Sequence, residues 1–166
     1  LSHQDSMGNK RAINVGEVQV MSAGTGLTHS EFNDSSSEET NFLQLWIIPE
    51  EMGVTPNYEQ RLFDASDRKN KLQTVVAPKD KLEGDALPIS QQAYIYRTDL
   101  DSNFSLSLNM KSKNNGYYIF VVDGSVELGD TKLDSRDAIG ITETDEVCIK
   151  AKLISSLIII EVPMIF

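Results

Sequence analysis

The sequence feature that most constrains the fold is a long series of short apolar runs broken by Gly, Asn, Asp and Pro. Runs of this length and spacing predict the strands of a sandwich or barrel. Asp123-Gly124 and Gly129-Asp130 lie between such runs and predict two tight hairpins. A short helix is compatible with residues 64–71. The predicted strands are residues 17–23, 42–48, 57–62, 72–77, 93–100, 104–108, 117–123, 125–128, 138–141, 147–151 and 156–162. We therefore expect an all-β protein.

Two of these runs carry expectations about burial. Residues 42–48 are strongly apolar, so this strand is expected to be central, with Trp46 packed in a core. Cys148 lies in a run that alternates like a strand, which favours a small core residue over a reactive thiol. As the single cysteine of the chain it also excludes an internal disulfide and suits the reducing cytoplasm.

The composition excludes two classes of partner. The chain has 15 Lys and Arg against 25 Asp and Glu, a formal net charge of −10. Such a charge repels phosphates, so direct binding to nucleic acid is not expected. The apolar run at residues 157–160 is far too short to cross a bilayer, so we expect no membrane association. The acidic stretch 34–39 predicts a solvated loop, either a simple linker or a mobile segment (33–40) that controls access to a site.

The pair His29 and Glu31 is the clearest chemical signal. In an extended segment the two side chains point to the same face, with Cα atoms about 6.5 Å apart. An imidazole and a carboxylate that converge in this way are half of a first-row metal site. A single His-x-Glu is a weak pattern by itself, because two polar residues on a solvated strand would look the same. His3 is the only other histidine of the chain.

Longer strings around this pair resemble the pirin family of bicupins. The resemblance is carried by HQDSMGN (3–9), MSAGTGLTHSEFN (21–33), FLQLWIIP (42–49) and TPNYEQR (55–61), and it continues more diffusely to the end of the chain. It implies two β-barrel, jelly-roll cupin domains, of which the first is incomplete here. Residues 1–80 would be the remainder of an N-terminal metal-binding cupin. Residues 81–166, which contain no histidine, would be a metal-free C-terminal cupin.

The resemblance also implies a metal and its ligands. Pirin-like proteins bind one transition metal, usually iron, through three histidines and one glutamate; nickel, zinc or manganese can take its place. His29 and Glu31 match two of these ligands, whereas His3 matches a position that is not a ligand. The other two histidines come from an earlier His-x-His motif that this chain lacks. We therefore expect them from a segment outside the chain; a shortened gene product or completion by another copy are the alternatives.

The activity implied by the resemblance is that of a quercetin 2,3-dioxygenase. A flavonol-like substrate would bind the metal, react with dioxygen and lose carbon monoxide as its ring opens. Glu31 would be the catalytic acceptor of the flavonol hydroxyl proton. Gln44 would contact substrate or water, or else simply face solvent. The alternative function is that of a non-enzymatic, metal- and redox-sensing regulator that acts through protein partners, and a third is a bicupin that has lost its chemistry.

Overall fold

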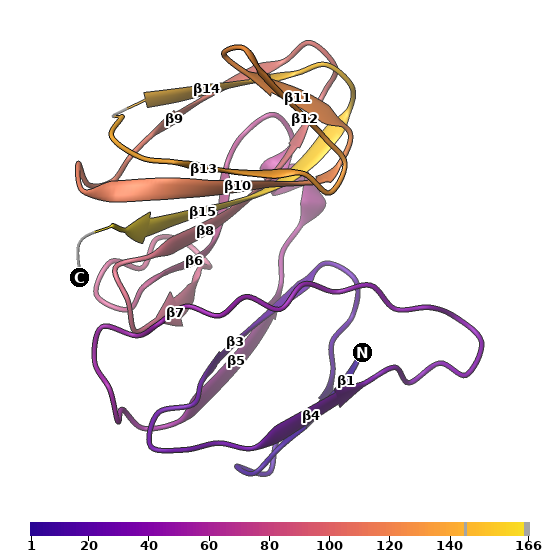
Figure 1. Ribbon diagram of the computed structural model, residues 1–166. Coiled ribbons are helices and arrows are strands. Elements are labelled where there is room, and N and C mark those ends of the chain that lie inside the picture. Colours follow the sequence, from indigo (N-terminus) through magenta and orange to yellow (C-terminus); the bar gives the residue numbers. More distant parts are fainter. Residues whose placement is uncertain (145, 165–166) are drawn as a thin grey trace.

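The computed structural model describes residues 1–144 and 146–164, and it is built almost entirely from strands (Figure 1). One four-residue 3-10 helix, η1 (Ala65–Arg68), is described. The strands are β1 (Ser2–Asp5), β2 (Lys10–Ala12), β3 (Glu17–Ser22), β4 (His29–Phe32), β5 (Asn57–Leu62), β6 (Gln73–Pro78), β7 (Leu87–Ile89), β8 (Tyr94–Leu100), β9 (Ser105–Asn109), β10 (Asn115–Asp123), β11 (Ser125–Leu128), β12 (Thr131–Asp134), β13 (Ala138–Ile141), β14 (Glu146–Ala151) and β15 (Ser155–Pro163). The expected all-β architecture is confirmed.

The C-terminal half is a sandwich of two sheets. One sheet has the order β13-β10-β15-β8-β6-β7 and the other has the order β12-β11-β14-β9. Strands such as β14 alternate exposed and buried residues, so each sheet presents one apolar face to the other. The centre of the resulting core contains Leu108, Ile119, Val121, Val126, Ile149 and Ile159.

The two turn motifs predicted from sequence have different outcomes. Gly129 and Asp130 join β11 to β12 as an antiparallel hairpin, as predicted. The hairpin predicted at Asp123-Gly124 is wrong, because β10 pairs with β13 and β15 whereas β11 belongs to the other sheet. Gly124 instead forms a corner between the sheets, with φ +96 and no room for a Cβ beside the Ile154 carbonyl. A Gly here permits both the positive φ and the close approach.

The N-terminal half consists of two smaller sheets. One has the order β2-β1-β4, and the other pairs β3 with β5. In Figure 1 these sheets lie below the C-terminal sandwich, and β3 and β5 run closest to it. Val18 and Val20 of β3 pack against a second apolar cluster that contains Val75, Val76 and Leu87. This cluster joins the two halves.

Three expectations about residues 42–48 and Cys148 are wrong. Residues 42–48 form no strand, and Trp46 is 88% exposed and not in a core. A strand needs a neighbour to satisfy its backbone groups, and no described strand pairs with this segment. Cys148 is exposed, because it falls on the outer face of β14 while Val147 and Ile149 face the core.

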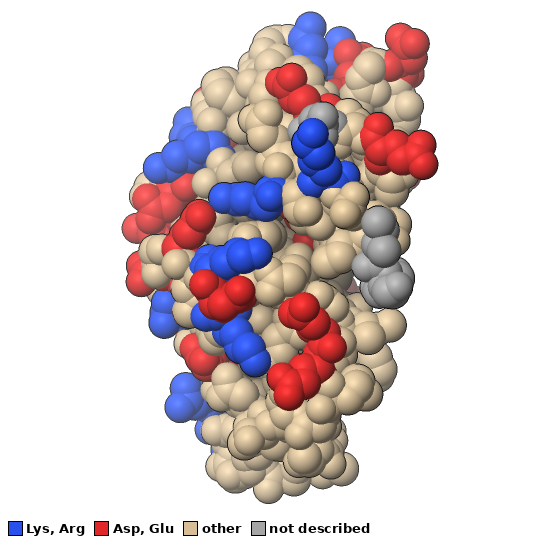
Figure 2. Space-filling model, turned by 90° about the vertical axis from the view of Figure 1, so that its left-hand side faces the viewer, with Lys and Arg blue, Asp and Glu red and all other residues tan. Residues whose placement is uncertain are grey.

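The proposed domain boundary at 80/81 remains a prediction. Strand β6, just before that boundary, pairs with β8 in the six-stranded sheet. Residues 145, 165 and 166 of the predicted second domain lie outside the described residues. In the described part of the chain, no helix has the length and apolar character required to cross a membrane. Figure 2 shows acidic and basic side chains interspersed over the upper part of one face, and few charges at its lower end.

Candidate metal centre

The candidate site lies on the paired strands β1 and β4. These strands are antiparallel, with His3 opposite Glu31 and Asp5 opposite His29. Because residues two apart share a face of a strand, all four side chains point to the same side. The structure thus brings the predicted pair His29 and Glu31 together with two residues that the sequence interpretation did not assign to the site.

His3 lies at the centre of this group. Its side chain is fully buried, with Nε2 3.3 Å from Asp5 Oδ2 and Nδ1 3.5 Å from Glu31 Oε1. The ring stacks against His29 at a centroid distance of 5.7 Å and also meets Tyr58 at 4.8 Å. His3 therefore contacts both predicted ligands.

Glu31 is held by one of its two carboxyl oxygens. Gln19 of β3 donates from Nε2 to Glu31 Oε1 over 3.1 Å, and the ring of His3 approaches the same oxygen. Within residues 1–144 and 146–164, no hydrogen bond reaches Oε2. This second oxygen is therefore available to a metal or to a substrate proton.

Asp5 ties the group to the turn that follows β1. Its carboxylate accepts hydrogen bonds from the backbone N–H groups of Met7 and Asn9 and from the Asn9 side chain. Burial acts to raise the pKa of Asp5, but the hydrogen bonds from Asn9, His3 and Met7 outweigh it, so that the pKa lies below the ordinary value of 3.8. Asp5 is thus a fixed, ionised acceptor at neutral pH.

Tyr58 of β5 packs against the ring of His3. Its hydroxyl donates to Gln60 Oε1 over 2.7 Å, and the Arg11 guanidinium lies 5.7 Å from its ring centroid. Burial raises the pKa of Tyr58 above 10. The phenol is therefore neutral at physiological pH and serves as a packing surface for His3.

The donor chemistry fits a first-row metal, but the donor set is incomplete. His29 is exposed and Glu31 partly exposed, so both side chains can be reached from outside. Stable sites of this kind use three or four protein ligands. In the part of the chain that the structure describes, no group of three or more His, Cys, Asp or Glu side chains could hold a metal ion.

For the other site features predicted from sequence, Gln44 and the loop 33–40, no contact with this group is described within residues 1–144 and 146–164. Gln44 is exposed in the unpaired segment 42–48. The loop 33–40 follows β4 directly and is braced by Asn33, which bonds Glu38 and Thr40; its mobility remains a prediction. The signal that could have found His3 and Asp5 is their own His-x-Asp spacing, which repeats the alternation of His29 and Glu31.

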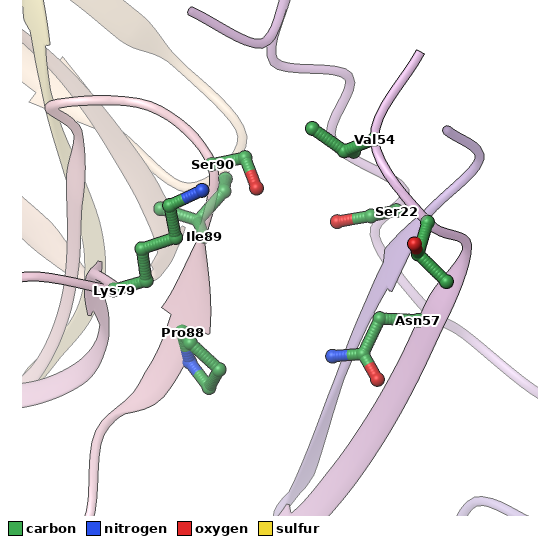
Figure 3. Close-up of a pocket in the computed structure, with 8 residues that line it drawn as sticks. Ser22, Val54, Asn57, Lys79, Pro88, Ile89 and Ser90 are labelled. Atoms are coloured by element: carbon green, nitrogen blue, oxygen red, sulfur yellow. The ribbon is translucent and has the colours of Figure 1, made fainter. Parts of the chain in front are cut away.

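A separate cleft of about 320 Å³ lies between the two halves. Figure 3 shows Lys79 and Ser90 on one side of it, and Ser22 and Asn57 on the other. His29, Glu31 and Gln44 do not line it. The cleft is therefore distinct from the candidate metal centre.

Comparison with known proteins identifies relatives over nearly the whole chain. Residues 74–162 match a family described as "Quercetinase C-terminal cupin domain", and residues 1–47 match one described as "Pirin". An Escherichia coli protein named quercetin 2,3-dioxygenase is 39% identical over 163 residues, which cover 98% of this chain and 68% of the relative.

Solved structures agree with this match. The crystal structure of YhhW from Escherichia coli superposes with a TM-score of 0.91 at 36% identity, over 99% of this chain and 68% of that one. A structure described as bacterial pirin YhhW in complex with nickel(II) gives a TM-score of 0.89 at 34% identity, with the same coverage. The sequence comparison and the structure comparison thus both find similar proteins in Escherichia coli.

Proposed function

Because the chain belongs to the pirin family of bicupins, we propose that it forms part of a metal-dependent dioxygenase acting on a flavonol-like substrate. The observation that carries this proposal is the common face of His29 and Glu31, in a chain 39% identical to a protein named quercetin 2,3-dioxygenase. The reaction consumes dioxygen, opens the flavonol ring and releases carbon monoxide. The single cysteine, Cys148, suits a cytoplasmic location.

His29 and Glu31 would hold a single transition metal, iron by preference, with nickel, zinc or manganese as possible occupants. A neutral imidazole and a carboxylate are donors that these metals accept. When bound, the metal would supply a Lewis acid for the substrate oxygens. The nickel(II) ion in the complex of the related YhhW belongs to that protein, and it supports a metal here without identifying which.

The chain's own residues prepare Glu31 for proton transfer. Gln19 donates a hydrogen bond to Oε1, and His3 Nδ1 lies 3.5 Å from the same oxygen, so that Oε2 is the oxygen left free. The carboxylate of Glu31 could then accept the hydroxyl proton of the flavonol as the substrate is bound. Gln44 would contact the substrate in the complete first cupin, where the exposed segment 42–48 would have a neighbour.

Two further histidines would come from a segment outside this chain. Two facts support this part of the proposal. The described residues contain no group of three or more His, Cys, Asp or Glu side chains that could hold a metal ion, and the matched region is 68% of the Escherichia coli relative. Two protein ligands leave the remaining positions to exchangeable water, so binding is weak. We expect residues 1–166 alone to retain little metal and the protein with the additional segment to retain one equivalent.

The test uses the full-length protein loaded with Fe²⁺ or Ni²⁺. Quercetin is added without oxygen, dioxygen is then admitted, and both the loss of flavonol absorption and the release of carbon monoxide are measured. We expect turnover by the wild type, none by His29→Ala, and unchanged turnover by Ser30→Ala, which alters the opposite face of the same strand. A metal-loaded wild type that leaves quercetin intact would contradict the dioxygenase proposal and favour the regulatory alternative.

A further inference from the structure

We propose that His3 is a positioning residue that holds Glu31 in the orientation required for metal binding, without being a ligand itself. This inference rests on the proposed metal site at His29 and Glu31. It assigns a role to a fully buried histidine that the proposed ligand set leaves unused.

The contacts of His3 place it behind both proposed ligands. Its Nδ1 faces Glu31 Oε1 at 3.5 Å, and its ring stacks on His29 at a tilt of 24°. Glu31 Oε1 also accepts the Gln19 amide, so Gln19 and His3 both lie against this oxygen and leave Oε2 open. A carboxylate whose free oxygen is fixed loses less rotational entropy when a metal binds.

The environment of Nδ1 argues against a purely apolar packing role. In the described part of the chain this atom is fully enclosed and has no hydrogen-bond partner within ordinary distance. A buried polar nitrogen without a hydrogen-bond partner is unfavourable, because it has lost its bonds to water. With a proton on Nδ1, a small closing movement of Glu31 towards His3 would convert the 3.5 Å contact into a hydrogen bond that Nδ1 donates to Oε1, and would remove that cost.

His3 is itself anchored from behind. Nε2 lies 3.3 Å from Asp5 Oδ2, and Asp5 is fixed by Met7 and Asn9 of the following turn. Tyr58 covers the remaining face of the ring. The turn after β1 thus holds Asp5, Asp5 contacts His3, and His3 contacts Glu31. Residues placed behind a metal ligand in this way orient it for binding.

Two replacements of His3 by an amide side chain test the contacts of its two ring nitrogens one at a time. In His3→Asn the side-chain amide nitrogen stands near the position of Nδ1 and can still donate to Glu31. In His3→Gln it reaches the position of Nε2 and can donate to Asp5, while the Glu31 contact is lost. His3→Leu removes both contacts and preserves burial.

The experiment measures Ni²⁺ affinity of the full-length protein by competition with a chelator, together with the absorption spectrum of the Co²⁺-substituted site. Thermal unfolding of the apo-proteins confirms that each variant is folded. We expect His3→Gln and His3→Leu to bind Ni²⁺ about 10–100-fold more weakly, and His3→Asn to bind close to wild type with an unchanged Co²⁺ spectrum.

Several outcomes would overturn the inference. If His3→Gln and His3→Leu bind Ni²⁺ as the wild type does, or if Asn and Gln weaken binding equally, His3 has only a packing role. If His3→Asn changes the Co²⁺ spectrum and loses the metal, His3 is a direct ligand. His29→Ala serves as the reference: if it retains full affinity, the proposed metal site fails, and the role given to His3 fails with it.

Discussion

Glu161 is expected to be a main determinant of stability in the C-terminal sandwich. Its side chain is fully buried on β15, between Tyr94 and Tyr117 of the neighbouring strands. Oε1 accepts the Lys111 backbone N–H and the Asn115 side-chain amide, each over 2.7 Å. Oε2 accepts the Tyr96 hydroxyl over 3.2 Å. One carboxyl group therefore connects β15 to β8, to the first residue of β10 and to the segment before it.

Replacement by leucine tests this role. Leucine has a side chain of similar size to glutamate and no polar atom. Glu161→Leu therefore leaves the buried Asn115 amide and the buried Tyr96 hydroxyl without their acceptor. Each buried donor left unsatisfied costs about 1–3 kcal/mol, so the loss of the acceptor for two of them should lower the free energy of unfolding by about 2–6 kcal/mol. The Lys111 N–H adds less, because this residue is exposed and water can replace its partner.

Glu161→Gln is the matched control. Its Oε1 can still accept both bonds, and its amide can donate to the Tyr96 hydroxyl, which rotates to accept. We expect a free energy of unfolding within about 1 kcal/mol of wild type. Urea unfolding followed by far-UV circular dichroism measures both variants. The reasoning is refuted if the leucine variant is as stable as wild type, or if glutamine is as damaging as leucine.

Three further predictions concern the core, a corner and acid stability. Ile119→Ala, at a fully buried position, should lower the free energy of unfolding by about 2–5 kcal/mol. Ile154→Ala, at a position 75% exposed, should change it by no more than about 0.5 kcal/mol. Equal effects of the two variants in urea unfolding would contradict the described core. Gly124→Ala would bring a Cβ against the Ile154 carbonyl, whereas Gly129→Ala has the same sign of φ and open space around it. Gly124→Ala should therefore be the more destabilising of the two. Thermal unfolding that ranks the two variants in the opposite order would count against the sheet corner. The hydrogen bond from the Ser66 backbone N–H lowers the pKa of Asp64 below 3.8, so the ionised carboxylate stabilises the fold above pH 3.8, and this stability is lost as the pH falls through the lower pKa of the folded state. Asp64→Asn keeps the cap but does not titrate. The free energy of unfolding of this variant should therefore fall less steeply below pH 3.8, in an acid titration followed by circular dichroism.

The sequence alone determined where most strands lie. The predicted bounds 57–62, 125–128 and 138–141 agree with β5, β11 and β13 as the structure has them. These segments are specified locally, because alternation and the turn residues that flank them are properties of a few neighbouring positions. The common face of His29 and Glu31 is equally local, since it follows from the two-residue period of any strand.

Only the tertiary structure decided which segments meet. Asp123-Gly124 has the chemistry of a hairpin turn, yet it forms a corner because β10 pairs with β13 and β15 in one sheet, whereas β11 pairs with β12 and β14 in the other. Cys148 is exposed because the pairing of β14 with β9 and β11 set which of its two faces meets the core. The approach of His3 to Glu31 depends on the pairing of β1 with β4, in which the two opposed residues, 3 and 31, are 28 positions apart in the chain. Such pairings are selected by the burial of whole faces, which no short window of sequence contains.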